Sequence, residues 1–184
     1  MMKLPPHFHA DVPETLTAAG FESDAIDHLL ELDAVIFQWH RMSSKGEVPR
    51  KLLAEMESDV DIGQFYSMTA VARIIYGIGR DEPQEATIGL LAEELNIDPS
   101  RASRVASDLI KRGLVRRRAS QEDGRKSILE FTQEAIDLLS AYRALKWTKA
   151  IEVYKDWPAE DIAAFSRLLQ RYVDGVGKAL HGKE

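Results

Sequence analysis

The segment 87–132 constrains the fold of this chain more than any other, because a helical pattern gives way there to a strand pattern. Apolar residues recur at helical spacing on both sides of a polar break at Asn96, and the second helical run ends at Gly113. A hairpin pattern follows, with the turn signal Asp123-Gly124 between its two arms. Two short helices joined by a tight turn and followed by a β-hairpin form a winged helix-turn-helix.

The first of these helices begins at the N-cap Thr87, and its inward face consists of Ile88, Leu91, Ala92 and Leu95. Residues 96–98 make the turn, where Asn and Asp tolerate the required backbone conformations. Asp98 then caps the second helix and Pro99 takes its first position, where the missing N–H costs nothing. This helix is predicted to run to about Arg112, with a buried face of Ala102, Val105, Ala106, Leu109 and Ile110.

The opposite face of the second helix is polar and basic; it presents Ser100, Arg101, Ser103, Arg104, Ser107 and Lys111. Small hydroxyls let a backbone approach DNA closely, and an arginine bonds two acceptors on guanine in the major groove. Two alternatives stay open for the arginines. Arg101 and Arg104 contact either bases or phosphates only, and Arg104 has a possible partner in Asp108 one turn on.

Charge is concentrated in the same region. Residues 99–126 hold nine Lys and Arg against three Asp and Glu, a local net charge of +6 in a chain whose total is −6. Such a basic surface on an otherwise acidic protein favours phosphate backbones as partners. On the hairpin, Arg117, Arg125 and Lys126 are the candidate DNA contacts. Arg125 at the tip either enters a minor groove or pairs only with Asp123.

These residues resemble the multiple antibiotic resistance regulator (MarR) family of winged-helix transcription factors. The resemblance rests on Leu91-Ala92, the Ser/Arg-rich helix, the strand motif Gly113-Leu114-Val115-x-Arg117 and the wing motif Asp123-x-Arg125. It implies a dimer built by the first and last helices, a wing in which Asp123 braces Arg125, and a small aromatic, often anionic, effector. Ala135 departs from the family pattern, which commonly has glycine there.

We expect a mainly α fold in which N- and C-terminal dimerisation helices flank the winged helix and its one small β-hairpin wing. The predicted parts are a flexible N-terminal arm (1–20), a dimerisation helix and connector (21–63), the DNA-binding domain (64–131) and C-terminal dimerisation helices (132–184). The predicted helices outside the motif cover 23–42, 49–56, 64–79, 133–156 and 159–180, with Ser23 and Thr132 as the predicted N-caps of the first and the fourth. Apolar residues occupy more than one face of the helix at 23–42, which indicates that a partner subunit buries part of this helix.

An effector pocket is predicted at Phe37, Trp39, Phe65, Met68 and Tyr76, although aromatic and Met residues at helical spacing are commonly core. The pair His7 and His9 is interpreted as an incidental surface pair rather than a metal site. His28 and His40 are either partly buried or, across a dimer axis, pH-sensitive contacts. No metal ligand set is expected.

The chain has no cysteine, so disulfides, thiolate catalysis and thiol switches are excluded. No apolar run approaches the roughly 20 residues of a membrane span, no secretory signal pattern is present, and a cytoplasmic location is expected. No catalytic motif or cofactor site is found. The prediction is therefore a homodimeric transcription regulator, a repressor of a pseudo-palindromic operator in double-stranded DNA, released by its effector. The alternative is a winged-helix protein-interaction module without specific DNA binding.

Overall fold

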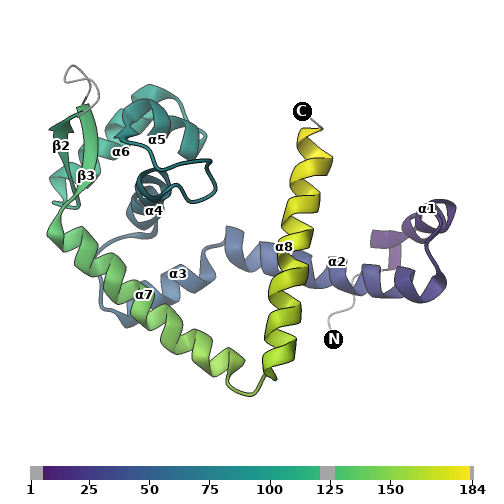
Figure 1. The fold of residues 1–184 in the computed structure, drawn as a ribbon. Coiled ribbons are helices and arrows are strands. Elements are labelled where there is room, and N and C mark those ends of the chain that lie inside the picture. Colours follow the sequence, from purple (N-terminus) through teal and green to yellow (C-terminus); the bar gives the residue numbers. More distant parts are fainter. Residues whose placement is uncertain (1–5, 121–126, 183–184) are drawn as a thin grey trace. The chain divides into compact units, whose positions relative to one another are not determined.

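The computed structural model of this protein describes residues 6–120 and 127–182 (Figure 1). These residues form eight α-helices, one 3-10 turn and a three-stranded sheet, so the predicted mainly α winged helix-turn-helix is confirmed. The chain divides into two compact units, residues 1–130 and 131–184. The first unit contains the helix-turn-helix and the sheet, and the second contains the two C-terminal helices.

The N-terminal segment contains more structure than its prolines suggested. Residues Pro6–His9 form the 3-10 turn η1, and α1 spans Val12–Ala18. Pro13 lies in the first turn of α1, where proline is favoured, so it begins a helix instead of preventing one. Two contacts hold this segment on α2 (Ser23–Ser44): His9 Nε2 lies 2.8 Å from Asp33 Oδ2, and the Phe8 and Phe37 rings meet edge to face.

Helix α2 extends two residues beyond the predicted end, and Glu22 occupies the N-cap position that we predicted for Ser23. Its buried residues are Ile26 and Ala34. Its other apolar side chains are largely exposed in the single chain; they include Leu29, Leu32, Val35 and Trp39. Helix α3 (Glu47–Glu55) follows after Gly46 and buries Leu52 and Leu53.

Helix α4 (Ile62–Tyr76) supplies the centre of the core. Asp61 caps it through a reciprocal capping box with Gln64, in which each side chain accepts from the other residue's backbone N–H. Its buried residues include Phe65, Met68, Val71 and Ile74. Gly77 ends the helix in the left-handed conformation, so α4 stops three residues before its predicted end at Gly79.

The helix-turn-helix follows the predicted pattern closely. Thr87 caps α5 (Ile88–Leu95) by accepting from the Leu90 N–H, and Asn96 makes the turn with a φ of 52°. Helix α6 (Pro99–Lys111) begins after the Asp98 cap, and its C-cap Arg112 is followed by Gly113 with a φ of 73°. The two helices pack against α4 (Figure 1).

The wing is a three-stranded sheet rather than a lone hairpin. Strands β2 (Val115–Ala119) and β3 (Ser127–Phe131) are the predicted arms, and β1 (Ala86–Thr87) is an additional strand. The strand order is β1-β3-β2, with Ala86 opposite Leu129 and Thr87 opposite Ile128 in an antiparallel pair. A two-residue strand has no period of its own in a sequence, which explains why it was not predicted.

The second unit consists of α7 (Gln133–Tyr154) and α8 (Ala159–His181). The predicted cap Thr132 accepts from the Ala135 N–H. At the elbow between the helices, the Trp157 ring contacts the rings of Tyr154 and Phe165 edge to face. None of the helices in the described ranges combines the length and the apolar character that a membrane span requires.

Candidate nucleic-acid interface

Helix α6 is placed by its cap and by its buried face. Asp98 Oδ1 accepts a hydrogen bond from the Arg101 N–H at 2.9 Å, which fixes the first turn. On the core side, Ala102, Ala106 and Leu109 are completely buried. The opposite side of the helix must therefore face away from the core, as the period of 3.6 residues requires.

The predicted DNA-contacting residues of α6 lie mostly on that outer side. Ser100, Arg101, Arg104, Ser107 and Lys111 are exposed, and Ser103 is half-buried. The Ser107 hydroxyl donates to the Ser103 carbonyl at 2.8 Å, so this hydroxyl is bound to its own helix. Within the described ranges, Arg101, Arg104 and Lys111 form no ion pair, and their charges are available to a partner.

One flank of α6 is tied to the start of α4. Gln64 Nε2 donates to Asp108 Oδ2 at 3.0 Å, and Arg112 Nη2 pairs with Asp59 Oδ2 at 2.9 Å. Arg112 also donates to the Asp59 carbonyl. Sequence reasoning missed both links, although the Asp61-x-x-Gln64 capping-box spacing is a recognisable signal for the start of α4.

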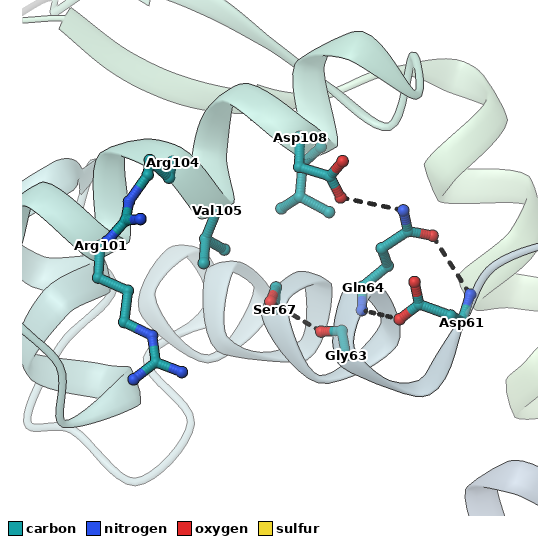
Figure 2. A pocket seen from close by; sticks show the side chains of 9 residues that line it. Asp61, Gly63, Gln64, Ser67, Arg101, Arg104, Val105 and Asp108 are labelled. Carbon is teal, nitrogen blue, oxygen red and sulfur yellow. Dashed lines mark hydrogen bonds between the residues drawn. The ribbon is translucent and has the colours of Figure 1, made fainter.

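An open pocket of about 410 Å³ lies along the same flank, between the first turns of α4 and the side of α6 that faces them (Figure 2). Figure 2 shows Asp108 directed at Gln64, whereas the guanidinium groups of Arg101 and Arg104 extend away from that pair. The lining includes Gly63, Ser67 and Val105 in addition to these residues. The pocket contains none of the residues that we predicted for an effector site.

The basic residues of the wing fall into two groups by strand alternation. Arg116 and Arg118 share one face of β2, where both pair with Glu130 of β3 at 3.0 Å and 3.8 Å. Arg117 points to the other face and has no ion-pair partner among the described residues. The candidate contacts Arg125 and Lys126 lie outside the described residues, as does Asp123.

A second ionic cluster joins α5 to α4 and to the loop that follows α4. Glu94 of α5 pairs with Arg73 of α4 and with Arg80 of the following loop. The hydrogen bond from Arg73 lowers the pKa of Glu94 most strongly. Burial acts in the opposite direction, and the Arg80 hydrogen bond and both positive charges bring the pKa of Glu94 below its ordinary value of 4.5. The cluster therefore fixes the position of α5 against α4.

The five residues of the predicted effector pocket have different surroundings in the described chain. Phe65 and Met68 are core residues, with exposed fractions of 4% and 0%. Phe37 contacts Phe8, and Trp39 and Tyr76 are more than half exposed. The histidines form separate contacts: His9 with Asp33, and His28 with Glu31 at 3.5 Å. Among the described residues, no group of three or more His, Cys, Asp or Glu is placed to hold a metal ion.

Taken together, the α6 face and β2 present unpaired cations on rigid elements beside small hydroxyls. This arrangement suits phosphate and base contacts with a nucleic acid.

Part of this sequence is similar to known transcription regulators. A model of the MarR family matches residues 69–126, which cover the helix-turn-helix and most of the wing. A Bacillus subtilis protein named as an uncharacterised HTH-type transcriptional regulator, YxaD, is 32% identical over 91 residues. That alignment spans 50% of this chain and 64% of the relative.

Solved structures share the fold at low sequence identity. A MarR family protein from Bacillus stearothermophilus has a TM-score of 0.63 and 14% identity, covering 86% of this chain and 100% of that one. Staphylococcus aureus MepR bound to ethidium bromide has a TM-score of 0.53 and 14% identity, covering 85% and 97%.

Proposed function

We propose that the protein is a sequence-specific DNA-binding transcription regulator that acts as a homodimer, because residues 69–126 match a model of the MarR family. The observation that carries this proposal is the outer face of α6. Its three cations Arg101, Arg104 and Lys111 are unpaired within the described chain, and its opposite face is fixed in the core. A rigid helix with free cations and exposed serines is suited to a major groove.

In this proposal the residues have separate roles. Ser100, Ser103 and Ser107 let α6 approach the bases, Arg101 and Arg104 contact bases or phosphates, and Lys111 contacts phosphate. Arg117 extends the phosphate contacts from β2, and Arg125 and Lys126 lie along the neighbouring minor groove. Support for a contact by Arg117 comes from its position opposite to the Glu130-paired arginines.

Unpartnered apolar faces support the dimer. Helix α2 exposes Val35 and Trp39, each 63% exposed. Helix α8 exposes a row of apolar side chains: Ile162, Phe165, Leu168, Leu169, Tyr172, Val173 and Val176. Exposed apolar rows of this size mark interfaces. Two-fold symmetry then calls for a pseudo-palindromic operator with half-sites about one helical turn, roughly 34 Å, apart.

We propose repression as the mode of action, because a dimer seated on its operator excludes other proteins from that DNA. Release would follow from an effector that favours a different spacing of the two α6 helices. The MepR structure contains ethidium, an aromatic ligand, which supports an aromatic effector here. The exposed aromatic residues Phe37, Trp39 and Tyr76 are the candidates for contacting it, whereas Phe65 and Met68 already serve the core.

Fluorescence anisotropy tests the proposed function. The purified protein is titrated into DNA from just upstream of its own coding sequence, into duplexes enriched by the protein from a random library, and into a scrambled duplex. We expect discrimination of at least about a thousandfold and a log–log salt slope of several units. The absence of binding to every duplex at low salt would contradict the proposal and favour a protein-interaction module.

A further inference from the structure

We propose that Gln64 is a positioning residue that keeps Arg104 free for DNA by holding the carboxylate of Asp108. This inference rests on the proposed function, because it assigns the control of a DNA contact to a residue of α4 that lies outside the α6 face. It follows from three observations: the hydrogen bonds of Gln64, the position of Arg104 relative to Asp108, and the second tie between α6 and the start of α4.

The orientation of the Gln64 amide is determined by its two partners. Its Oε1 accepts from the Asp61 N–H at 3.2 Å, which leaves its Nε2 as the group that faces Asp108 Oδ2 at 3.0 Å. Asp61 Oδ1 in turn accepts from the Gln64 N–H at 2.9 Å. The donor that holds Asp108 is therefore fixed by the capping box of α4, and a flipped amide would lose both bonds.

Arg104 is the competing partner for the same carboxylate. It precedes Asp108 by four residues, so the two side chains lie on neighbouring positions of α6 and can meet. In the structure, Asp108 is turned toward Gln64 and the Arg104 guanidinium extends away from it (Figure 2). An exposed pair on one helix is weak, and a basic residue placed before the acidic one is the less favourable order. The amide donor of Gln64, which the capping box holds in place, is therefore sufficient to bind the Asp108 carboxylate in preference to Arg104.

The link between Arg112 and Asp59 keeps Gln64 within reach. Arg112 follows Asp108 by one turn on the same flank of α6, and Asp59 precedes Gln64 in the connector to α4. The Asp59 carboxylate is largely exposed, so its ion pair with Arg112 is weak, but the hydrogen bond from Arg112 to the Asp59 carbonyl also joins the end of α6 to this connector. As a result, Asp108 stays beside Gln64 while Arg104 remains on the open side of the helix.

The variant Gln64→Glu tests this role. Glutamate preserves the shape of the side chain and the capping box, since it accepts from the Asp61 N–H in the same way. It has no donor for Asp108, however, and the two carboxylates repel. Asp108 then turns to Arg104, and we expect operator affinity to fall about tenfold, with a much smaller fall for the scrambled duplex. In this background, Arg104→Ala should cost little more, because Arg104 is already engaged.

Three further proteins make the test specific. Gln64→Glu combined with Asp108→Asn exchanges donor and acceptor, so operator affinity and the full effect of Arg104→Ala should return. Gln64→Ser replaces the long amide by a short hydroxyl that does not reach Asp108; it adds no charge and should also reduce the effect of Arg104→Ala. Gln133→Glu is the matched control: Gln133 Nε2 donates to Asp137 Oδ1 at 2.8 Å, so this variant breaks the same kind of bond and adds the same charge on α7. Its operator affinity should stay within about twofold of the wild type, which is the ordinary effect of one distant surface charge.

The outcomes separate the two proposals. A wild-type protein that does not discriminate between duplexes overturns the proposed function, and this inference with it. A wild type that discriminates, with a Gln64→Glu variant that keeps its affinity and the full Arg104→Ala effect, overturns only the role of Gln64. Equal losses on both duplexes with an additive Arg104→Ala effect would also overturn it, because added charge alone then accounts for the result. Thermal melts of each variant identify any that fail to fold, and the Gln64→Ser comparison then decides.

Discussion

Arg80 contacts the carboxylate of Glu94 at two points, with Nη2 2.7 Å and Nε 3.1 Å from Oε2. Arg73 Nε donates to the other carboxylate oxygen, Oε1, at 2.5 Å. Glu94 therefore joins α5 both to α4 and to the loop that follows α4. Because its side chain is only 16% exposed, little water competes for these bonds.

This cluster predicts an acid-sensitive stability. The folded pKa of Glu94 lies below its ordinary value of 4.5, so the charged form stabilises the fold fully above that pH. Its contribution is lost as the pH falls from 4.5 through the lower, folded pKa. We expect Glu94→Gln to lower the free energy of unfolding at pH 7 by about 1–3 kcal/mol, with a smaller loss in acid. Urea melts at pH 7 and at pH 4 would measure both values, and an equal loss at the two pH values would contradict the assignment.

Gly77 should be far less replaceable than its neighbour Gly79. Both have positive φ angles, 65° and 74°. A Cβ at Gly77 would lie 2.8 Å from the backbone N of Pro83, whereas a Cβ at Gly79 would meet nothing within 4 Å. We therefore expect Gly79→Ala to cost about 1 kcal/mol for the backbone conformation alone, and Gly77→Ala about 2–3 kcal/mol. Thermal or chemical unfolding of the two variants checks the difference; equal costs would argue against the close approach.

The alternation of β2 predicts unequal roles for its arginines. Arg117→Ala should weaken binding several-fold on specific and scrambled DNA alike, and lower the salt slope by about one, as expected for a lost phosphate contact. Arg116→Ala should have a smaller effect, because Arg116 is already paired with Glu130. Anisotropy titrations at several salt concentrations compare the two variants. A larger loss for Arg116→Ala would reverse our assignment of the two faces.

The exposed face of α2 predicts a dimer that a single charge disrupts. Val35→Asp should shift the protein to monomer in analytical ultracentrifugation and abolish tight operator binding, since a buried unpaired charge is costly. Val35→Ile keeps an apolar side chain and should retain the dimer. A Val35→Asp monomer that bound its operator with full affinity would show that α2 does not contribute to DNA binding through assembly.

Local signals in the sequence predicted the parts of the fold that are locally encoded. The caps Thr87, Asp98 and Thr132, the turn at Asn96 and the stop at Gly113 are all determined by side chains within a few residues of the backbone groups they satisfy. For the same reason, the bounds of α5 and α6 came within a residue of the observed ones.

Contacts between distant segments were not predictable in this way. The pairs Gln64–Asp108 and Arg112–Asp59 join residues 44 and 53 positions apart, and no local pattern in the sequence indicates that they are in contact. Strand β1 has two residues and exists only because β3 pairs with it. The assignment of Arg101, Arg104, Lys111 and Arg117 as DNA contacts stays a prediction, although these are the cations that the described structure leaves without ion pairs.

Thr87 has a consequence for how this chain can vary in length. Its backbone belongs to β1, opposite Ile128, and its hydroxyl caps α5 at the very next residue. No spare residue separates strand from helix, so an inserted or deleted residue there would break either the strand pairing or the cap. The loop between Gly77 and Gln84 lies just upstream, and Gly79 within it has neither a strand partner nor a helix to cap. We expect natural length changes among relatives to accumulate in that loop, while the junction at Thr87 keeps a constant length.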